Sequence, residues 1–137
     1  MVKKEKKNSN DLIWKLTILE FYLSIYALTG TSGDPPDDDN LDGNNLAYIT
    51  LIGTADASVG TPAGLVFYGY FFPDGSNLRP PKNDTDEHGK PYVQMDLNIS
   101  QLAGLVSLLG NTPRCTAQYV VSGEDRTATI IGDHQCP

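Results

Sequence analysis

The clearest pattern of apolar and polar positions lies in the last third of the chain. Residues 93–99 alternate strictly between apolar and polar side chains, and this period of two predicts a strand with one buried face. Ser100 follows at an N-cap position. The next apolar residues recur at the spacing of one helix face: Leu102, Leu105, Val106 and Leu109. Gly110 stands where helices commonly end, so the pattern predicts a short helix over about residues 100–110.

Further strands are predicted on both sides of this helix. Residues 46–54 have the composition of a strand, and residues 65–72 form a continuous apolar run that is typical of a central strand covered on both faces. Residues 115–121 and 126–131 flank a Ser-Gly-Glu-Asp turn and predict a hairpin. Residues 74–91 are polar, and they form a loop that is too long for a plain connection.

The apolar segment 12–28 fits two kinds of element. As a helix, it would place the following residues on one seam: Leu12, Leu16, Leu19, Leu23 and Tyr26. As a strand, it would place these residues on one face: Leu19, Phe21, Leu23, Ile25 and Ala27. Its β-branched and aromatic content slightly favours the strand, but periodicity alone leaves both alternatives open.

Two charged residues argue against a membrane-spanning role for this segment. Lys15 and Glu20 lie inside it, and each would cost about 2.5–3.5 kcal/mol at the centre of a bilayer. Burial of each large apolar side chain is worth about 1.5–3 kcal/mol, so an exposed segment would forfeit much of a domain's stability. We therefore expect residues 12–28 to pack on their own domain or on another copy of the chain.

These elements predict one small domain with an extended N-terminal part. Residues 1–45 comprise a basic tail, the apolar element and an acidic linker, and residues 46–137 form the domain. The expected fold class is α+β, with a mainly antiparallel sheet, one short covering helix and an N-terminal apolar helix or strand.

Composition narrows the classes of function. A net charge of −7 argues against a nucleic-acid partner, because phosphate binding needs a concentrated basic surface. No nucleophile, nucleotide-binding or phosphate-loop motif occurs, so we expect neither an enzyme nor a cofactor. The only histidines, His88 and His134, have no zinc-like spacing to the two cysteines.

The acidic linker contains a weak candidate for calcium. Asp38, Asn40 and Asp42 occupy positions 1, 3 and 5 of a calcium loop, and Gly43 occupies position 6. Position 12 is Ile49, where such a loop needs a bidentate carboxylate. We therefore expect an acidic linker without a metal site.

The cysteines leave the compartment open. Cys115 and Cys136 lie near opposite ends of the predicted hairpin, so a single disulfide is compatible with their positions. In a reducing cytosol both would stay free thiols. We expect a cytoplasmic protein, with secretion as the alternative.

Candidate contact residues gather near the long polar loop and in the hairpin. Tyrosine and arginine are favoured at binding surfaces, and long loops carry function more often than short ones. The candidates for ligand or partner contact are Tyr68, Tyr70, Arg79, Tyr92, Arg114 and Arg126.

Residues 100–110, followed by the Thr-Pro-Arg-Cys-Thr run 112–116, resemble a strand–helix–strand segment of small uncharacterised phage proteins. Within residues 91–121, this resemblance implies a phage accessory protein that acts in the host cytosol, and some such proteins sequester signalling nucleotides. No functional residue carries over, because the long C-terminal helices associated with the segment are absent here.

The expected function is that of a non-enzymatic binding or assembly protein, whose partner is another copy of the chain or another protein. The alternatives are a protein that sequesters a small anionic ligand, such as a signalling nucleotide, and a secreted or surface-anchored module.

Overall fold

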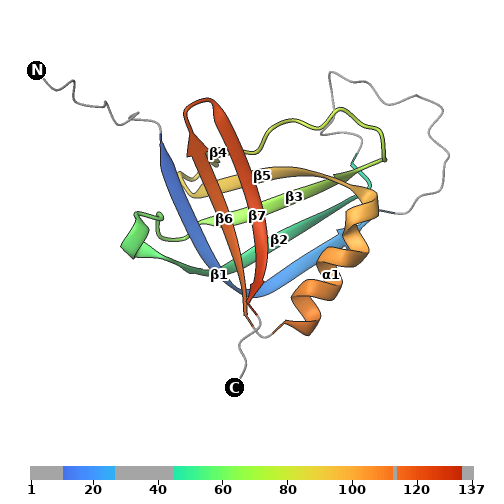
Figure 1. The fold of residues 1–137 in the computed structure, drawn as a ribbon, viewed down its shortest axis with the longest axis horizontal. Coiled ribbons are helices and arrows are strands. Elements are labelled where there is room, and N and C mark those ends of the chain that lie inside the picture. The colour runs from blue at the N-terminus through green and yellow to red at the C-terminus, as the bar shows by residue number, and fades with distance from the viewer. Residues whose placement is uncertain (1–10, 27–44, 113, 134–137) are drawn as a thin grey trace, which may run out of the picture.

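A mixed sheet of seven strands makes up most of the computed structural model, which describes residues 11–26, 45–112 and 114–133 (Figure 1). The strands are β1 (Leu12–Ile25), β2 (Ala47–Ala55), β3 (Val66–Phe72), β4 (Lys82–Thr85), β5 (Pro91–Asn98), β6 (Arg114–Ser122) and β7 (Asp125–Asp133). Their order in the sheet is β4-β5-β3-β2-β1-β6-β7, and every neighbouring pair is antiparallel except β3 with β5. The one α-helix of the described part, α1 (Leu102–Asn111), joins β5 to β6. The α+β class with a mainly antiparallel sheet is confirmed.

Strand β1 lies inside this sheet, between β2 and β6, and resolves the ambiguity of the apolar N-terminal segment. Its first half pairs with β6, and its second half pairs with β2. The strand alternative is therefore right for Leu12–Ile25, and the segment packs on its own domain, in one sheet with the strands that follow. Ala27 and Leu28 lie outside the described residues.

A β-bulge explains why β1 turns even-numbered apolar residues towards the core before Leu19 and odd-numbered ones after it. The register shifts between Ile18 and Glu20, so Leu19 is left unpaired and 72% exposed. The residues that pack on the core are Leu12, Trp14, Leu16 and Ile18 before the bulge, and Phe21 and Leu23 after it. The predicted strand face was wrong at Leu19, because the bulge inverts the alternation there.

The bend in β1 depends on a glycine in β2. Gly53 lies opposite Ile18, next to the bulge. A Cβ at Gly53 would lie 1.7 Å from the carbonyl oxygen of Thr17. Only a residue without a side chain allows the two backbones to approach this closely.

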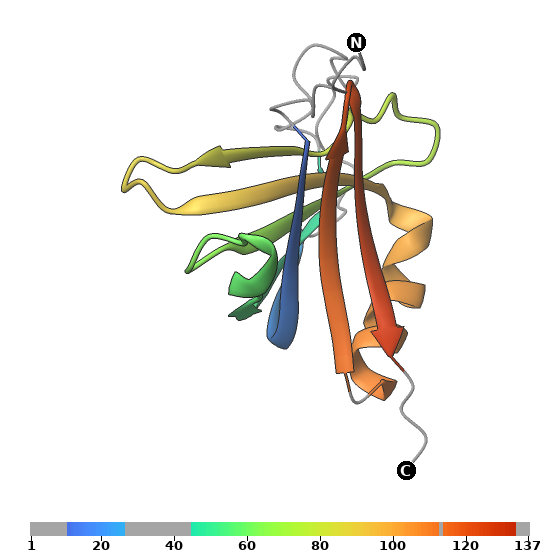
Figure 2. The ribbon, with the colours of Figure 1, turned by 60° about the vertical axis from the view of Figure 1, so that its left-hand side comes forward.

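The sheet folds back on itself, so that its inner face encloses the core. Figures 1 and 2 show β6 and β7 crossing the direction of β2, β3 and β5. The fully buried residues of the two sides include Ile49, Leu51, Phe67, Phe71 and Val93 on one side and Ala117 and Tyr119 on the other. The Tyr119 hydroxyl donates a hydrogen bond to Asn83 Oδ1 on β4 at 3.0 Å, which joins β6 to the opposite edge of the sheet.

Helix α1 packs on this core through Leu102, Leu105 and Leu109. The predicted helix is confirmed, but its ends differ from the prediction. It is preceded by a 3₁₀ turn over Ile99–Gln101, where Gln101 Oε1 accepts a hydrogen bond from the Asn98 N–H at 2.9 Å. Ser100 therefore lies inside this turn and is not the N-cap.

Three other predictions need adjustment. The helix continues through Gly110 to Asn111. Strand β3 is fully buried on its inner face, whereas the outer residues Val66, Tyr68 and Tyr70 are only partly buried. On the outer face of β3, only Phe72 at the end of the strand is fully buried. The polar loop 74–91 contains β4, which pairs with β5. The predicted hairpin is confirmed as β6 and β7.

Candidate functional site

The outer face of the sheet gathers six of the seven tyrosines of the chain. They alternate with the core residues along β1, β2, β3 and β5, so they share the face that points away from the core. This tyrosine face comprises Tyr22, Tyr26, Tyr48, Tyr68, Tyr70 and Tyr92. The seventh, Tyr119, is fully buried in the core.

The rings of the tyrosine face touch one another across neighbouring strands. Tyr26, Tyr48 and Tyr70 form a row, with ring centroids 6.0 and 6.4 Å apart. Tyr68 and Tyr92 meet edge to face at 5.7 Å. These distances are typical of favourable aromatic pairs, and each ring limits the rotamers of the next. The surface is thus largely ordered before any partner binds.

The tyrosine face remains accessible to a partner. Tyr22 is 56% exposed and Tyr26 is 46% exposed, and the other four members are partly buried. Ser24, Thr50 and Gln94 complete the face with small polar groups. Large aromatic side chains beside uncharged polar groups are typical of the contact residues of protein interfaces.

An ion pair limits the tyrosine face at the end of β3 and β5. Arg79 Nε donates to Asp96 Oδ2 at 2.7 Å, and Arg79 Nη2 donates to Asp96 Oδ1 at 2.9 Å. The guanidinium carbon also lies 5.9 Å from the centroid of the Phe72 ring. Because of this cover, Phe72 is fully buried and the Asp96 side chain is only 2% exposed. Arg79 is therefore engaged in holding the connection between β3 and β4 against the sheet.

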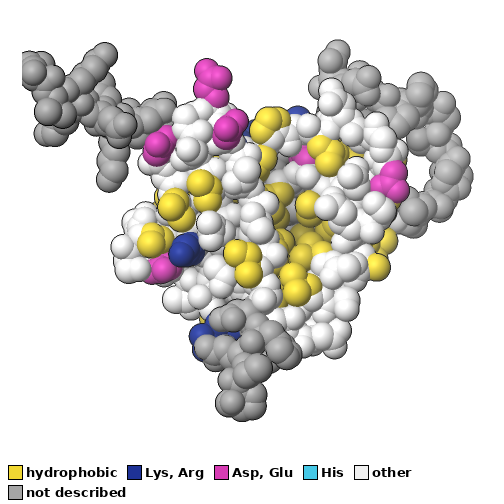
Figure 3. Space-filling model, in the orientation of Figure 1, with side chains coloured by type: hydrophobic (Ala, Val, Ile, Leu, Met, Phe, Trp, Pro, Cys, Tyr) yellow, Lys and Arg dark blue, Asp and Glu magenta, His cyan; other side chains and the backbone are white. Residues whose placement is uncertain are grey.

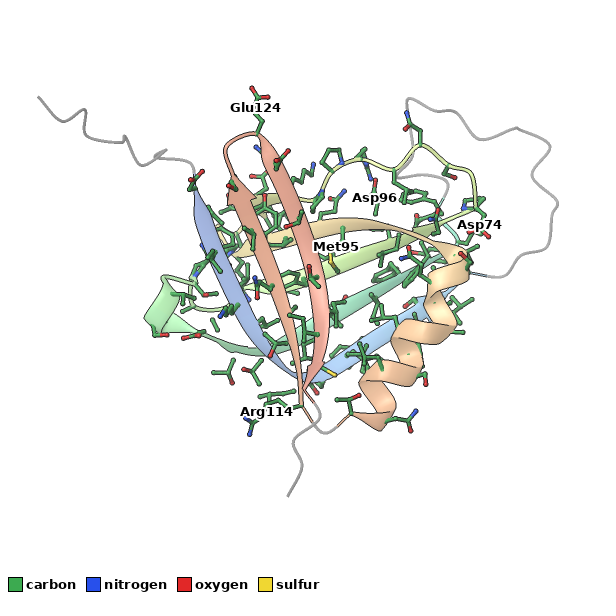
Figure 4. All side chains as sticks on the ribbon, in the orientation of Figure 1. Asp74, Met95, Asp96, Arg114 and Glu124 are labelled. Atoms are coloured by element: carbon green, nitrogen blue, oxygen red, sulfur yellow. The ribbon has the colours of Figure 1, made fainter. Side chains whose placement is uncertain are left out.

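The residues proposed from the sequence fall into two groups. Tyr68, Tyr70 and Tyr92 share the tyrosine face, and Arg79 lies at its border. Arg114 and Arg126 lie elsewhere. Arg114 begins β6 at the far end of the molecule (Figure 4), and Arg126 lies on β7, where its charge acts on Tyr119.

Half of the tyrosine face was missed in the sequence. Tyr22, Tyr26 and Tyr48 lie far along the chain from the polar loop 74–91, near which the tyrosine candidates were predicted. Strand alternation places Tyr22 and Tyr26 on one face of the chain, but their proximity to Tyr70 depends on the order of strands in the sheet.

The ionisable groups with shifted pKa values lie away from this face. Backbone hydrogen bonds, first from Lys90 and also from His88, lower the pKa of Asp86 in the exposed β4–β5 turn. Burial raises the pKa of the Cys115 thiol, whose Sγ lies 3.7 Å from the Leu108 carbonyl oxygen. Burial likewise raises the pKa of Tyr119.

Metal-binding and redox predictions rest mostly on residues beyond the described ranges. Asp38, Asn40, Asp42, His134 and Cys136 all lie outside them. Within the described ranges, no three His, Cys, Asp or Glu side chains are close enough to hold a metal ion.

Comparisons with protein-family models, with curated proteins and with solved structures give no match for this chain. Among the described residues, there is no helix with the length and apolar character needed to cross a bilayer.

Proposed function

We propose that this chain is a non-enzymatic binding protein that assembles with a second copy of itself through the tyrosine face. The observation that carries the proposal is the gathering of six tyrosines on one side of the sheet, five of them in four strands and Tyr26 directly after β1. A two-fold interface needs a surface that is complementary to itself. Tyrosine, serine, threonine and glutamine side chains meet this need, because each can both donate and accept a hydrogen bond.

Charge also favours a second copy as the partner. The chain carries a net charge of −7, so most encounters between two copies are repulsive. On the outer face of β1–β5, Lys15 and Glu20 lie at one side and Lys82 with Asp84 at the other, while Asp96 is paired with Arg79. The tyrosine face is thus nearly neutral, and two copies can meet there at little electrostatic cost.

The dimensions of the face suggest how stable such a dimer is. Five strands about 4.8 Å apart, with about six residues each at about 3.3 Å, give a plane of roughly 24 by 20 Å. A standard interface buries about 800 Å² on each partner, so this face is at the small end. We therefore expect a dimer of micromolar affinity that dissociates on dilution.

Sedimentation velocity over a range of concentrations tests the proposal. Tyr22→Glu places a charge in the proposed interface and should leave the protein monomeric. Ile131→Glu is the matched control, because Ile131 is 45% exposed on the outer side of β7, away from the face. It should dimerise like the unchanged chain. A chain that stays monomeric up to about 1 mM, or a Tyr22→Glu variant that dimerises normally, would refute the proposal.

The alternative of a protein that sequesters a small anion has less support. Arg79 is engaged with Asp96, and Arg114 and Arg126 lie apart from the tyrosine face. The resemblance to phage proteins supports a role as a phage accessory protein in the host cytoplasm, which is compatible with self-association.

A further inference from the structure

An apolar groove lies between β7 and α1, on the opposite side of the sheet from the tyrosine face. It has a volume of about 450 Å³, and residues of β5 form its floor. Its apolar lining consists of Met95, Leu97, Leu105, Leu108, Ala128 and Ile130. Figure 3 shows this hollow with hydrophobic atoms exposed inside it, and Figure 4 places Met95 near its centre.

One wall of the groove is the open edge of the sheet. β7 is the last strand in the sheet order, and its nine residues pair with β6 without a register shift. The strand contains neither proline nor lysine, which commonly protect edge strands. Because the hairpin turn has only two residues, the N–H and C=O groups of Arg126, Ala128 and Ile130 point away from β6.

We propose that this groove binds an extended peptide segment of a partner protein, which adds to the sheet as a strand beside β7. The open backbone edge of β7 favours an extended chain, which can form backbone hydrogen bonds with it. The apolar floor determines the character of every second side chain of that segment. Residues of the segment opposite Ala128 and Ile130 face Met95 and Leu97, so they should be apolar. The residue opposite Arg126 lies beside the positive charge of this exposed residue, which also acts on Tyr119, so it should be acidic.

Other occupants fit the groove less well. Residues 1–10 are mostly lysine and polar side chains, which do not suit an apolar floor. A second copy that offered its own β7 would bring Arg126 on the row of Ala128 and Ile130, where charge complementarity calls for an acidic residue. The acidic-and-apolar alternation therefore points to a segment of another protein.

A glycine in α1 provides a way to block the groove without damaging the fold. Gly104 lines the groove, and a Cβ there would meet no atom within 4 Å. Gly110 is equally open, lies in the same helix and does not line the groove. Gly104→Tyr and Gly110→Tyr are thus a matched pair, and both should fold because glycine is a poor helix former.

The probe is a capped synthetic peptide, Ser-Glu-Thr-Leu-Thr-Leu-Thr-Ser, tested together with its reversed sequence to allow either strand direction. Titration followed by NMR should show binding of one of the two to the full chain, with slower amide exchange at Ala128 and Ile130. Gly104→Tyr should weaken binding about tenfold or more through steric exclusion, and Gly110→Tyr should leave it unchanged. Equal binding to both variants would overturn the proposal.

A charge exchange tests the predicted order of side chains. A second peptide carries lysine in place of the glutamate. Arg126→Glu should weaken binding of the glutamate peptide and strengthen binding of the lysine peptide, each about two- to fivefold, as for an exposed ion pair. Decanoate serves as a small apolar probe in the same NMR experiment. A third outcome is that decanoate binds in the groove and neither peptide protects the β7 amides from exchange. That result would make the groove a small-molecule pocket and would overturn the proposal of strand addition.

Discussion

The two faces of β2 and β3 both carry large side chains but differ in how deeply these are buried. On the inner face, Ile49, Leu51, Phe67 and Phe71 are fully buried. On the outer face, Tyr48, Thr50, Tyr68 and Tyr70 keep part of their surface in contact with solvent. Because a strand alternates between its faces, one continuous apolar run in the sequence supplies both a core and a candidate interface.

The hydroxyl group is what separates the two faces. Phenylalanine and aliphatic residues on the inner face need no hydrogen-bond partner, whereas a tyrosine combines a large apolar ring with a polar group that favours contact with water or a partner. The inner face should therefore govern stability, and the outer face should govern association.

Removal of a core aromatic ring should have the largest effect on stability. We expect Phe67→Ala to lower the free energy of unfolding by about 3–5 kcal/mol, because it leaves a cavity in the core. Tyr68→Thr, at the next residue on the outer face, should cost less than about 1.5 kcal/mol, since threonine suits an exposed strand position. Urea unfolding monitored by circular dichroism measures both. Equal losses would remove the distinction between the faces.

Backbone contact at the bend should be the next most sensitive feature. Gly53→Ala should destabilise the protein by about 1–3 kcal/mol or more, because its Cβ would overlap the Thr17 carbonyl oxygen. Gly104→Ala, in the open side of α1, should instead stabilise it by about 0.5–1 kcal/mol. Thermal unfolding of the two variants should give shifts of opposite sign, and shifts of the same sign would contradict the account of the bend.

The ion pair at the border of the tyrosine face should make a moderate contribution. Arg79→Ala leaves the buried Asp96 carboxylate without its bidentate partner, and we expect a loss of about 1–3 kcal/mol. The double variant Arg79→Ala with Asp96→Asn should recover part of this loss, because the uncompensated charge is then absent. Urea unfolding measures the difference, and a double variant less stable than Arg79→Ala alone would contradict it.

The smallest predicted effect concerns alkaline pH. Since burial raises the pKa of Cys115, the folded state holds the thiol proton to a higher pH than the unfolded chain does. Thiols of an unfolded chain ionise at about pH 8.5. The contribution of Cys115 to stability is therefore fully present below about pH 8.5, and it falls as the pH rises towards the pKa of the folded state. Cys115→Ala should flatten this part of the decline, as measured by urea unfolding between pH 7 and about pH 10. An unchanged slope would show that Cys115 does not contribute.

The elements that were predicted correctly are those whose apolar periodicity lies within one continuous segment of the sequence. The strand over residues 93–99, the helix that follows and the last hairpin are of this kind, and the structure contains all three. The N-cap was wrong by two residues, because Asn98 and Gln101 make the capping contact instead of Ser100. β4 was missed, since its four polar residues become a strand only by pairing with β5.

The candidate site depended more strongly on long-range order. The loop region singled out Tyr68, Tyr70 and Tyr92, but the sequence could not show that Tyr48 lies next to Tyr70. Likewise, Arg126 and Arg79 occupy different sides of the sheet, although both were candidates for one ligand. Side chains from separate strands meet only through strand order and register, which no single segment encodes.

The most direct test of the central claim is the concentration dependence of the tyrosine ring signals in NMR spectra of the full chain. The claim predicts that the ring resonances of Tyr22, Tyr26, Tyr48, Tyr68, Tyr70 and Tyr92 shift together as the protein is concentrated. The buried Tyr119 serves as the internal reference and should not move. Shifts confined to other parts of the sheet, or six tyrosine signals that stay constant while the protein dimerises, would contradict the assignment of the outer face as the interface.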